Sequence, residues 1–82
     1  METKIVKLSD INIKTSFWLN PPRPSKINAC YSYYLMHHNF DRDIIVDRKM
    51  TLQDGYVAYL VAKMMGCTTV YVKINNKIMV AA

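Results

Sequence analysis

The sequence predicts a small α/β fold of the α+β kind, in which a mixed sheet packs with two main helices. Two segments rich in Val and Ile, residues 43–47 and 70–74, are typical of strands. Two longer segments, residues 26–38 and 56–65, carry helix boundary signals. The chain has 82 residues, which is enough for one domain, so we expect residues 1–82 to form a single domain.

The N-terminal part of the chain is expected to hold one strand and one proline-rich loop. Residues 4–8 mix apolar and polar side chains at a spacing near two, which favours a strand. Residues 11–18 are interpreted as an extended segment or a short helical turn. The prolines at positions 21, 22 and 24 favour extended backbone, and we expect neither a helix nor a central strand there.

The first long helix is expected at residues 26–38, with Ser25 as its N-cap. Asn39 and Asp41 end this helix. The residues that recur at helical spacing define its expected packed face: Ile27, Tyr31, Tyr34, Leu35 and His38. Of the adjacent pair His37 and His38, one is expected to pack and the other to face water, because neighbours on a helix point about 100° apart.

Two short strands are expected next, at residues 43–47 and 50–52, joined by a turn at Arg48 and Lys49. The sign of the charge alternates at residues 41–43, which predicts a solvated surface with local ion pairs.

The second helix is expected at residues 56–65, opened by a tight loop at residues 53–55 and ended by Gly66. A strand at residues 70–74 follows, and a turn at residues 75–76 precedes a segment, residues 78–80, that pairs back or extends the sheet edge. The predicted order of elements is therefore β, loop, α, β, β, α, β.

The charge of the chain favours attraction to polyanions. Eleven Lys and Arg against six Asp and Glu give 11 − 6 = +5 at neutral pH. The lysines are spread from Lys4 to Lys77, so the sequence shows no concentrated basic patch.

The cysteines and the hydrophobic runs indicate a cytoplasmic protein without a membrane segment. The longest apolar run, residues 56–62, is shorter than the roughly 20 residues that span a bilayer, and the N-terminus has no apolar region of a secretory signal. Cys30 and Cys67 match neither a disulfide framework nor a metal motif, so we expect free thiols in a reducing compartment.

The segment LQDGYVAYLVAKMMG, residues 52–66, resembles a helix-opening motif of the ParB N-terminal/sulfiredoxin superfamily. The matching positions are Asp54, Gly55, Tyr59, Ala62, Lys63 and Gly66. The proline–arginine segment at residues 21–26 stands where that family has a similar loop, and the resemblance covers residues 4–74. It implies the family fold in its stand-alone, minimal form, because the chain has no room for the helical DNA-reading domain and dimerisation segment of a ParB partition protein.

The chain departs from the family at two functional positions. Sulfiredoxins place a reactive cysteine directly after the glycine, where this sequence has Tyr56, so sulfiredoxin chemistry is excluded. Nucleotide-binding members have an arginine where this sequence has Ala58, so the bidentate phosphate clamp is missing from that helix. Cys67 lies about 16–18 Å away along the helix axis and does not replace the missing thiol.

Two segments are candidates for a nucleic-acid or phosphate site. Arg23, Ser25 and Lys26 combine two cations, a hydroxyl and a helix N-terminus, although the sequence favours a plain cap with solvated cations over an anion site. Asp54, Gly55 and Tyr56 open the second helix, whose free amides attract anions. Asp54 is interpreted either as a cap of that helix or as a base or metal ligand, and no second carboxylate nearby in sequence completes a metal site.

Tyr33 and Tyr34 are candidates for an interface. Tyrosines interleaved with Lys and Arg stack on bases or anchor a protein partner, and the alternative is that they fill the small core. Because Tyr33 lies off the apolar face of its helix, the interface and the core remain equally weighted interpretations.

The function that we expect is a non-catalytic binding module that acts on nucleic acid or on a nucleic-acid-handling protein complex, with no cofactor and no metal. Because stand-alone members of this family and size are often encoded by phages and mobile elements, the resemblance also implies an inhibitor such as an anti-CRISPR. Two alternatives stay open: a ParB-like nucleotide-binding enzyme or nuclease with a degenerate phosphate site, and a homodimer formed by exposed tyrosines and methionines.

Overall fold

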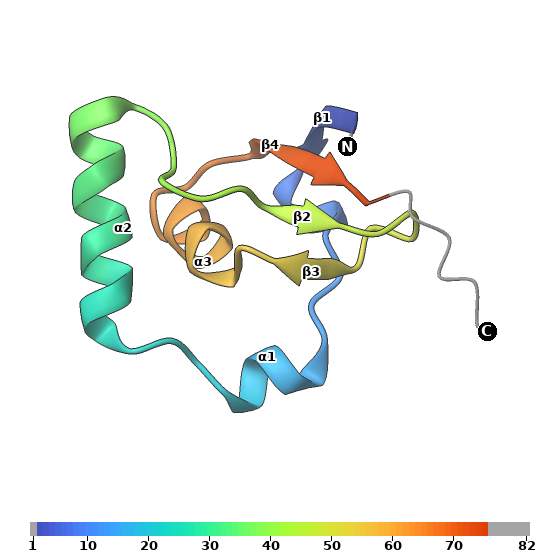
Figure 1. Cartoon of the computed structure of the whole chain (residues 1–82), viewed down its shortest axis with the longest axis horizontal. Helices are drawn as coiled ribbons and strands as arrows, with labels where there is room; N and C mark the ends of the chain where they lie inside the picture. The colour runs from blue at the N-terminus through green and yellow to red at the C-terminus, as the bar shows by residue number, and fades with distance from the viewer. Residues whose placement is uncertain (1, 76–82) are drawn as a thin grey trace.

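The computed structural model describes residues 2–75 and contains a four-stranded sheet with helices packed on it (Figure 1). The strands are β1 (Glu2–Lys7), β2 (Ile45–Val46), β3 (Leu52–Asp54) and β4 (Thr69–Ile74). The helices are η1, a 3-10 turn (Leu8–Asp10), α1 (Thr15–Leu19), α2 (Pro24–His37) and α3 (Tyr56–Met64). The predicted mixed α+β fold is therefore confirmed, and the predicted turn and strand beyond Asn75 lie outside the described residues.

The sheet has the strand order β1-β4-β2-β3, so β4, the last strand within residues 2–75, lies inside the sheet. β4 pairs antiparallel with β1, from Glu2 opposite Ile74 to Lys7 opposite Thr69, and parallel with β2. β2 and β3 form an antiparallel pair. Figure 1 shows α3 between α2 and the strands, and α1 in the connection that leads from η1 to α2.

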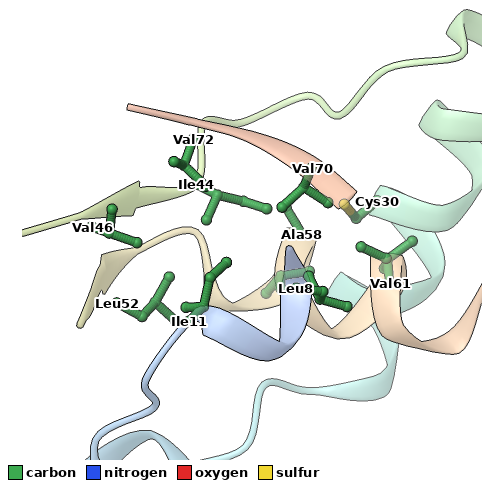
Figure 2. Close-up of a cluster of buried hydrophobic side chains, with 12 residues drawn as sticks. Leu8, Ile11, Cys30, Ile44, Val46, Leu52, Ala58, Val61, Val70 and Val72 are labelled. Carbon is green, nitrogen blue, oxygen red and sulfur yellow. The ribbon is translucent and has the colours of Figure 1, made fainter. Parts of the chain in front are cut away.

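The core lies between the sheet and α3 (Figure 2). Val46, Leu52, Val61 and Val72 are fully or almost fully buried. The first two come from β2 and β3, the third from α3 and the fourth from β4. The buried side chains of residues 43–47 confirm that the segment packs inside, although only two of its residues form a strand.

The start of α2 differs from the sequence prediction. The helix begins at Pro24 with Arg23 as its N-cap, and Ser25 lies inside the first turn without a capping bond. Proline suits the first helical position because its fixed φ matches the helix and the amide it lacks has no partner there. The third proline therefore opens a helix that we expected it to exclude.

The packed face of α2 also differs from the prediction. Cys30 is the one buried residue of α2, while Ile27 and Tyr34 are half-buried and Leu35 is 53% exposed. His38 is not on the face at all, because it ends the helix in the left-handed region with φ +58°. α2 packs against α3 at the margin of the molecule, so only a narrow stripe of the α2 surface is buried.

Two glycines bound α3. Gly55 is the N-cap with φ +86°, and Gly66 follows the helix with φ +75°. The amides of Gly66 and Cys67 donate to the carbonyls of Lys63 and Ala62, which is the Schellman pattern predicted by the glycine. Gln53 and Asp54, expected in a loop, belong to β3.

Within residues 2–75, no helix combines the length and the apolar character that crossing a membrane requires.

Candidate functional site

A cleft of about 370 Å³ lies where the proline loop meets the start of α3. Phe17 and residues 20–23 form one wall, and Lys26 adds the first turn of α2. Residues 54–57, at the junction of β3 and α3, form another wall, and Arg42 reaches the cleft from the loop before β2. The cleft thus joins three segments that are distant in sequence: residues 17–26, residue 42 and residues 54–57.

Five of the six residues chosen from the sequence as a phosphate site line this cleft: Arg23, Lys26, Asp54, Gly55 and Tyr56. The sixth, Ser25, is exposed in the first turn of α2 and is not part of the lining. Two segments that the sequence separates by about thirty residues therefore contribute to one cavity.

Gly55 makes the close junction of β3 and α3. Its backbone carbonyl accepts the amide of Tyr59 at 3.0 Å, which starts the helix, and its own amide donates to Oδ1 of Asp54 at 2.8 Å. A Cβ at this position would lie 2.8 Å from Cα of Ile44 and closer still to the carbonyl oxygen of Asp43. Glycine therefore lets the segment before β2 cross directly over the start of α3.

Asp54 does not cap α3 as the sequence suggested. Its carboxylate holds the amide of Gly55, which precedes the helix, and the N-cap makes no side-chain hydrogen bond to the first turn. The amides at the start of a helix have no intrahelical partner. Because Tyr56 and Val57 line the cleft, the positive end of α3 lies beside it.

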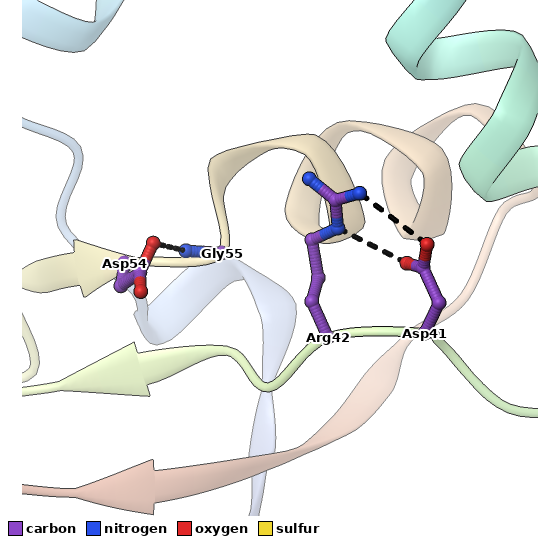
Figure 3. Close-up of polar contacts among 4 residues, drawn as sticks. All are labelled: Asp41, Arg42, Asp54 and Gly55. Carbon is purple, nitrogen blue, oxygen red and sulfur yellow. Dashed lines mark hydrogen bonds and ion pairs between the residues drawn. The ribbon is translucent and has the colours of Figure 1, made fainter.

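Arg42 is a residue of the cleft that no sequence motif indicated. Figure 3 shows its side chain projecting beside α3, on the same side of the loop as Asp41. Ala58, where the family's arginine is absent, is fully buried in the core, so no guanidinium fits there. Arg42 instead brings a guanidinium to the cleft from the loop before β2.

The charges that line the cleft are unbalanced. Arg23, Lys26 and Arg42 contribute three positive charges, and Asp54 contributes one negative charge, so the lining carries 3 − 1 = +2. The positive end of α3 lies beside these cations and adds to the positive potential of the cleft.

Arg42 is held by Asp41 through two hydrogen bonds. Nε donates to Oδ1 at 3.0 Å and Nη2 donates to Oδ2 at 3.3 Å. This contact lowers the pKa of the Asp41 carboxyl and raises that of Arg42. Burial raises the pKa of the Cys30 thiol, and the neighbouring Asp41 carboxylate raises it further. The local ion pair predicted at residues 41–43 is thus present.

Aromatic rings stiffen one side of the cleft. The rings of Phe17 and Tyr56 lie 5.1 Å apart between centroids, and Tyr56 lies 6.1 Å from Tyr59 in a stacked arrangement. The ring of Tyr56 thus packs the start of α3 against Phe17 of α1.

The two tyrosines chosen as interface residues lie outside the cleft. The ring of Tyr33 is 4.3 Å from that of His37, and half-buried Tyr34 is 4.8 Å from Phe40. His37 and His38 are both exposed, which corrects the expectation that one of them packs inside.

Within residues 2–75, no three His, Cys, Asp or Glu side chains gather as a metal site. Cys30 is a buried free thiol and Cys67 a half-buried one.

Comparisons with protein-family models and with curated proteins find no match. Solved structures with the same fold do match. A Pnob8-like ParB-N domain in its C2221 form aligns with TM-score 0.76 and 17% identity, over 94% of this chain and 30% of that chain. A pNOB8-like ParB N-domain aligns with TM-score 0.66 and 22% identity, over 89% of this chain and 26% of that one.

Sulfiredoxin from Arabidopsis thaliana aligns with TM-score 0.76 and 14% identity, over 94% of this chain and 88% of that chain. The protein therefore has the ParB N-domain/sulfiredoxin-like fold that the sequence resemblance predicted. The chain spans less than a third of the length of the two ParB chains that it matches.

Proposed function

We propose that this protein, which has the ParB N-domain/sulfiredoxin-like fold, is a non-catalytic module that binds the phosphates of nucleic acid in the cleft at the start of α3. One observation carries the proposal: a single cleft gathers Arg23, Lys26 and Arg42 beside the N-terminus of a helix. Phosphate oxygens accept hydrogen bonds from guanidinium groups, ammonium groups and free helix amides alike.

The cleft suits a phosphate held by charge and hydrogen bonds. Arginine forms bidentate contacts with phosphate, and Arg23 lines the cavity. Arg42 also lines it and contributes positive charge, with its Nε and Nη2 already bonded to Asp41. Asp54 could compete with a phosphate for the cations of the cleft. Its Oδ1, however, already accepts a hydrogen bond from the amide of Gly55, which reduces this competition. These contacts recognise backbone and carry no sequence information, so we expect binding without strong sequence specificity.

The ParB-N neighbours support the proposal only through their shared fold. If the partner is a protein complex bound to nucleic acid, the same cleft binds the phosphates of the nucleic acid in that complex. The narrower role of a phage or mobile-element inhibitor of the anti-CRISPR type stays a prediction.

The test is fluorescence anisotropy with a labelled 12-nucleotide poly-dT over a range of salt concentrations. The double variant Arg23→Ala/Lys26→Ala removes two cleft cations. A matched control, Lys4→Ala/Lys49→Ala, removes the same charge from exposed positions outside the cleft.

We expect the cleft variant to bind at least about 10-fold more weakly at 100 mM salt. Its slope of log K against log salt falls by about 1.4, because each neutralised phosphate of a single strand contributes about 0.7. The control variant keeps a slope within about 0.5 of the wild type. Equal losses in both variants would mean that only net charge matters, and the proposed cleft would be wrong.

The rival function, a nucleotide-using enzyme or nuclease built on Asp54, Arg23 and Lys26, makes a different prediction. ATP or CTP with Mg²⁺ would raise the melting temperature, and the nucleotide or the DNA would be hydrolysed in an Asp54-dependent manner. Salt-sensitive DNA binding with no nucleotide-dependent shift supports the binding module.

A further inference from the structure

A second cavity, of about 340 Å³, lies between the end of α2, the loop that follows it and the start of β4. Three aromatic rings line it: Tyr34, Phe40 and Tyr71. Asn39 and Thr69 add polar groups at its margin. We call this cavity the aromatic groove.

The aromatic groove differs from the phosphate cleft in charge. Its lining includes Arg42 and Asp43, whose formal charges cancel, and His38, which is counted as neutral at pH 7. The cleft shares Arg42 with the groove and adds Arg23, Lys26 and Asp54, so its lining carries +2. Asp43 is also paired with Lys73, with 2.8 Å between Oδ2 and Nζ. A neutral cavity with aromatic walls suits an uncharged planar group better than a phosphate.

Tyr71 gives the groove an open aromatic face. It lies on β4 opposite Ile5, and it is 71% exposed although its neighbours Val70 and Val72 are buried. Tyr34 and Phe40, with centroids 4.8 Å apart, make the inner wall. Exposed tyrosines are the platforms on which proteins stack unpaired bases, because every base has a π-face.

Arg42 connects the two cavities, since its side chain lines both. The nearest residues of α2 that line them are Lys26 in the cleft and Tyr34 in the groove. Eight residues of helix separate these two positions by about 12 Å along the axis. Stacked nucleotides are spaced by about 3.4 Å along one strand, so a ligand that fills both cavities contains about three to four nucleotides.

We propose that the aromatic groove stacks an unpaired base of a single-stranded nucleic acid whose backbone phosphates lie in the cleft. The inference rests on the proposed function and narrows it from nucleic acid in general to single strands. A base in a duplex is stacked and paired, so its face does not reach the groove. The charge contrast assigns the sugar–phosphate backbone to the cleft and the base to the groove.

The experiment compares two ligands of equal charge: labelled 12-nucleotide poly-dT and an abasic 12-mer with the same sugar–phosphate backbone. Both are titrated by anisotropy against the wild type, Tyr71→Ala, Tyr71→Phe and Arg23→Ala/Lys26→Ala. Tyr71 is exposed, so its variants are expected to fold, and circular dichroism melting checks this.

We expect Tyr71→Ala to weaken poly-dT binding by about 10-fold and to leave abasic binding unchanged. Tyr71→Phe keeps the ring and binds poly-dT like the wild type. The cleft double variant weakens the binding of both ligands. Half-buried Cys67 lines the groove, so poly-dT slows its alkylation by iodoacetamide in the wild type and the abasic 12-mer does not.

Equal binding of poly-dT and the abasic 12-mer to the wild type would overturn the groove assignment and leave the phosphate cleft standing. Equal weakening of both ligands by Tyr71→Ala would overturn it as well. A duplex 12-mer or thymidine monophosphate that binds as tightly as poly-dT would overturn the single-strand assignment. Failure of both 12-mers to bind the wild type would instead remove the proposed function together with the inference.

Discussion

Gly55→Ala tests the close crossing of the segment before β2 over the start of α3. Gly55 has φ +86°, and a Cβ there would lie 2.8 Å from Cα of Ile44 and closer still to the carbonyl oxygen of Asp43. The left-handed conformation alone costs an alanine about 1–2 kcal/mol. The clash is with backbone, so it is relieved only by moving residues 43–44, at a further cost of about 1–3 kcal/mol.

Gly66→Ala is the matched control. Gly66 has a similar φ of +75°, but a Cβ there meets no atom within 4 Å. It therefore carries the conformational cost without the clash, about 1–2 kcal/mol. The two variants differ in free energy of unfolding by the cost of the clash, about 1–3 kcal/mol. A domain of this size loses about 4–8 °C of melting temperature per kcal/mol.

The assay is urea unfolding followed by circular dichroism, with thermal melting alongside it. We expect Gly66→Ala to melt about 4–16 °C below the wild type, and Gly55→Ala to melt lower than Gly66→Ala by a further 4 °C or more. Gly55→Ala also weakens poly-dT binding, because residues 43–44 directly follow Arg42. Equal destabilisation by the two substitutions would refute the close crossing.

Three further predictions concern the core, the ion pair and the thiols. Leu52→Ala empties a fully buried position and lowers the free energy of unfolding by about 2–5 kcal/mol in urea titrations, whereas Leu19→Ala, at a residue 74% exposed, changes it by less than about 0.5 kcal/mol. Asp41→Asn frees Arg42 and raises poly-dT affinity about 2- to 5-fold by anisotropy; weaker binding would mean that Asp41 positions the guanidinium. The pKa of Asp41 is lowered in the folded state, so its ion pair with Arg42 stabilises the fold at pH values above the ordinary pKa of 3.8. This stabilisation, less than about 1 kcal/mol for such exposed groups, is lost as the pH falls below that value. Iodoacetamide at neutral pH labels Cys67 before Cys30, which is buried with a raised pKa, and mass spectrometry finding Cys30 labelled first would contradict its burial.

The strands were predictable because buried strands are rich in β-branched apolar residues. Ile44 and Val46 are buried in the segment of residues 43–47, and Val70 and Val72 are buried on β4. Runs of β-branched residues of this length fit a packed sheet whatever their neighbours are. The glycine that ends α3 was equally predictable, because the Schellman turn is a local structure.

The packed face of α2 was not predictable from spacing alone. Tyr31 and Leu35 have helical spacing and are exposed, because α2 packs against α3 along a narrow stripe that leaves these two side chains facing solvent. Apolar periodicity indicates which residues share a face, and only the tertiary structure decides how much of that face has a neighbour.

Only part of the candidate site was predictable from the sequence, because the rest depends on tertiary contacts. Arg23, Lys26 and the residues around Gly55 were found because they match or adjoin motifs of the family, and the structure brings them together. Arg42 was assigned to a local surface pair because its sequence neighbours are acidic. Arg42 reaches the cleft because residues 43–44 cross over Gly55. This contact joins residues eleven or more positions apart, so no sequence pattern near Arg42 indicates it.

The position of β4 inside the sheet constrains how the protein is made. Two other strands and three α-helices separate β1 from β4 in the described part of the chain, yet the two strands pair, with Glu2 opposite Ile74. Until β4 has been synthesised, both β1 and β2 present unpaired backbone edges, and neither can complete a sheet without it. Contacts between strands so distant in sequence form late and slowly. The sheet is therefore complete only when residues 2–7 and 69–74 have come together.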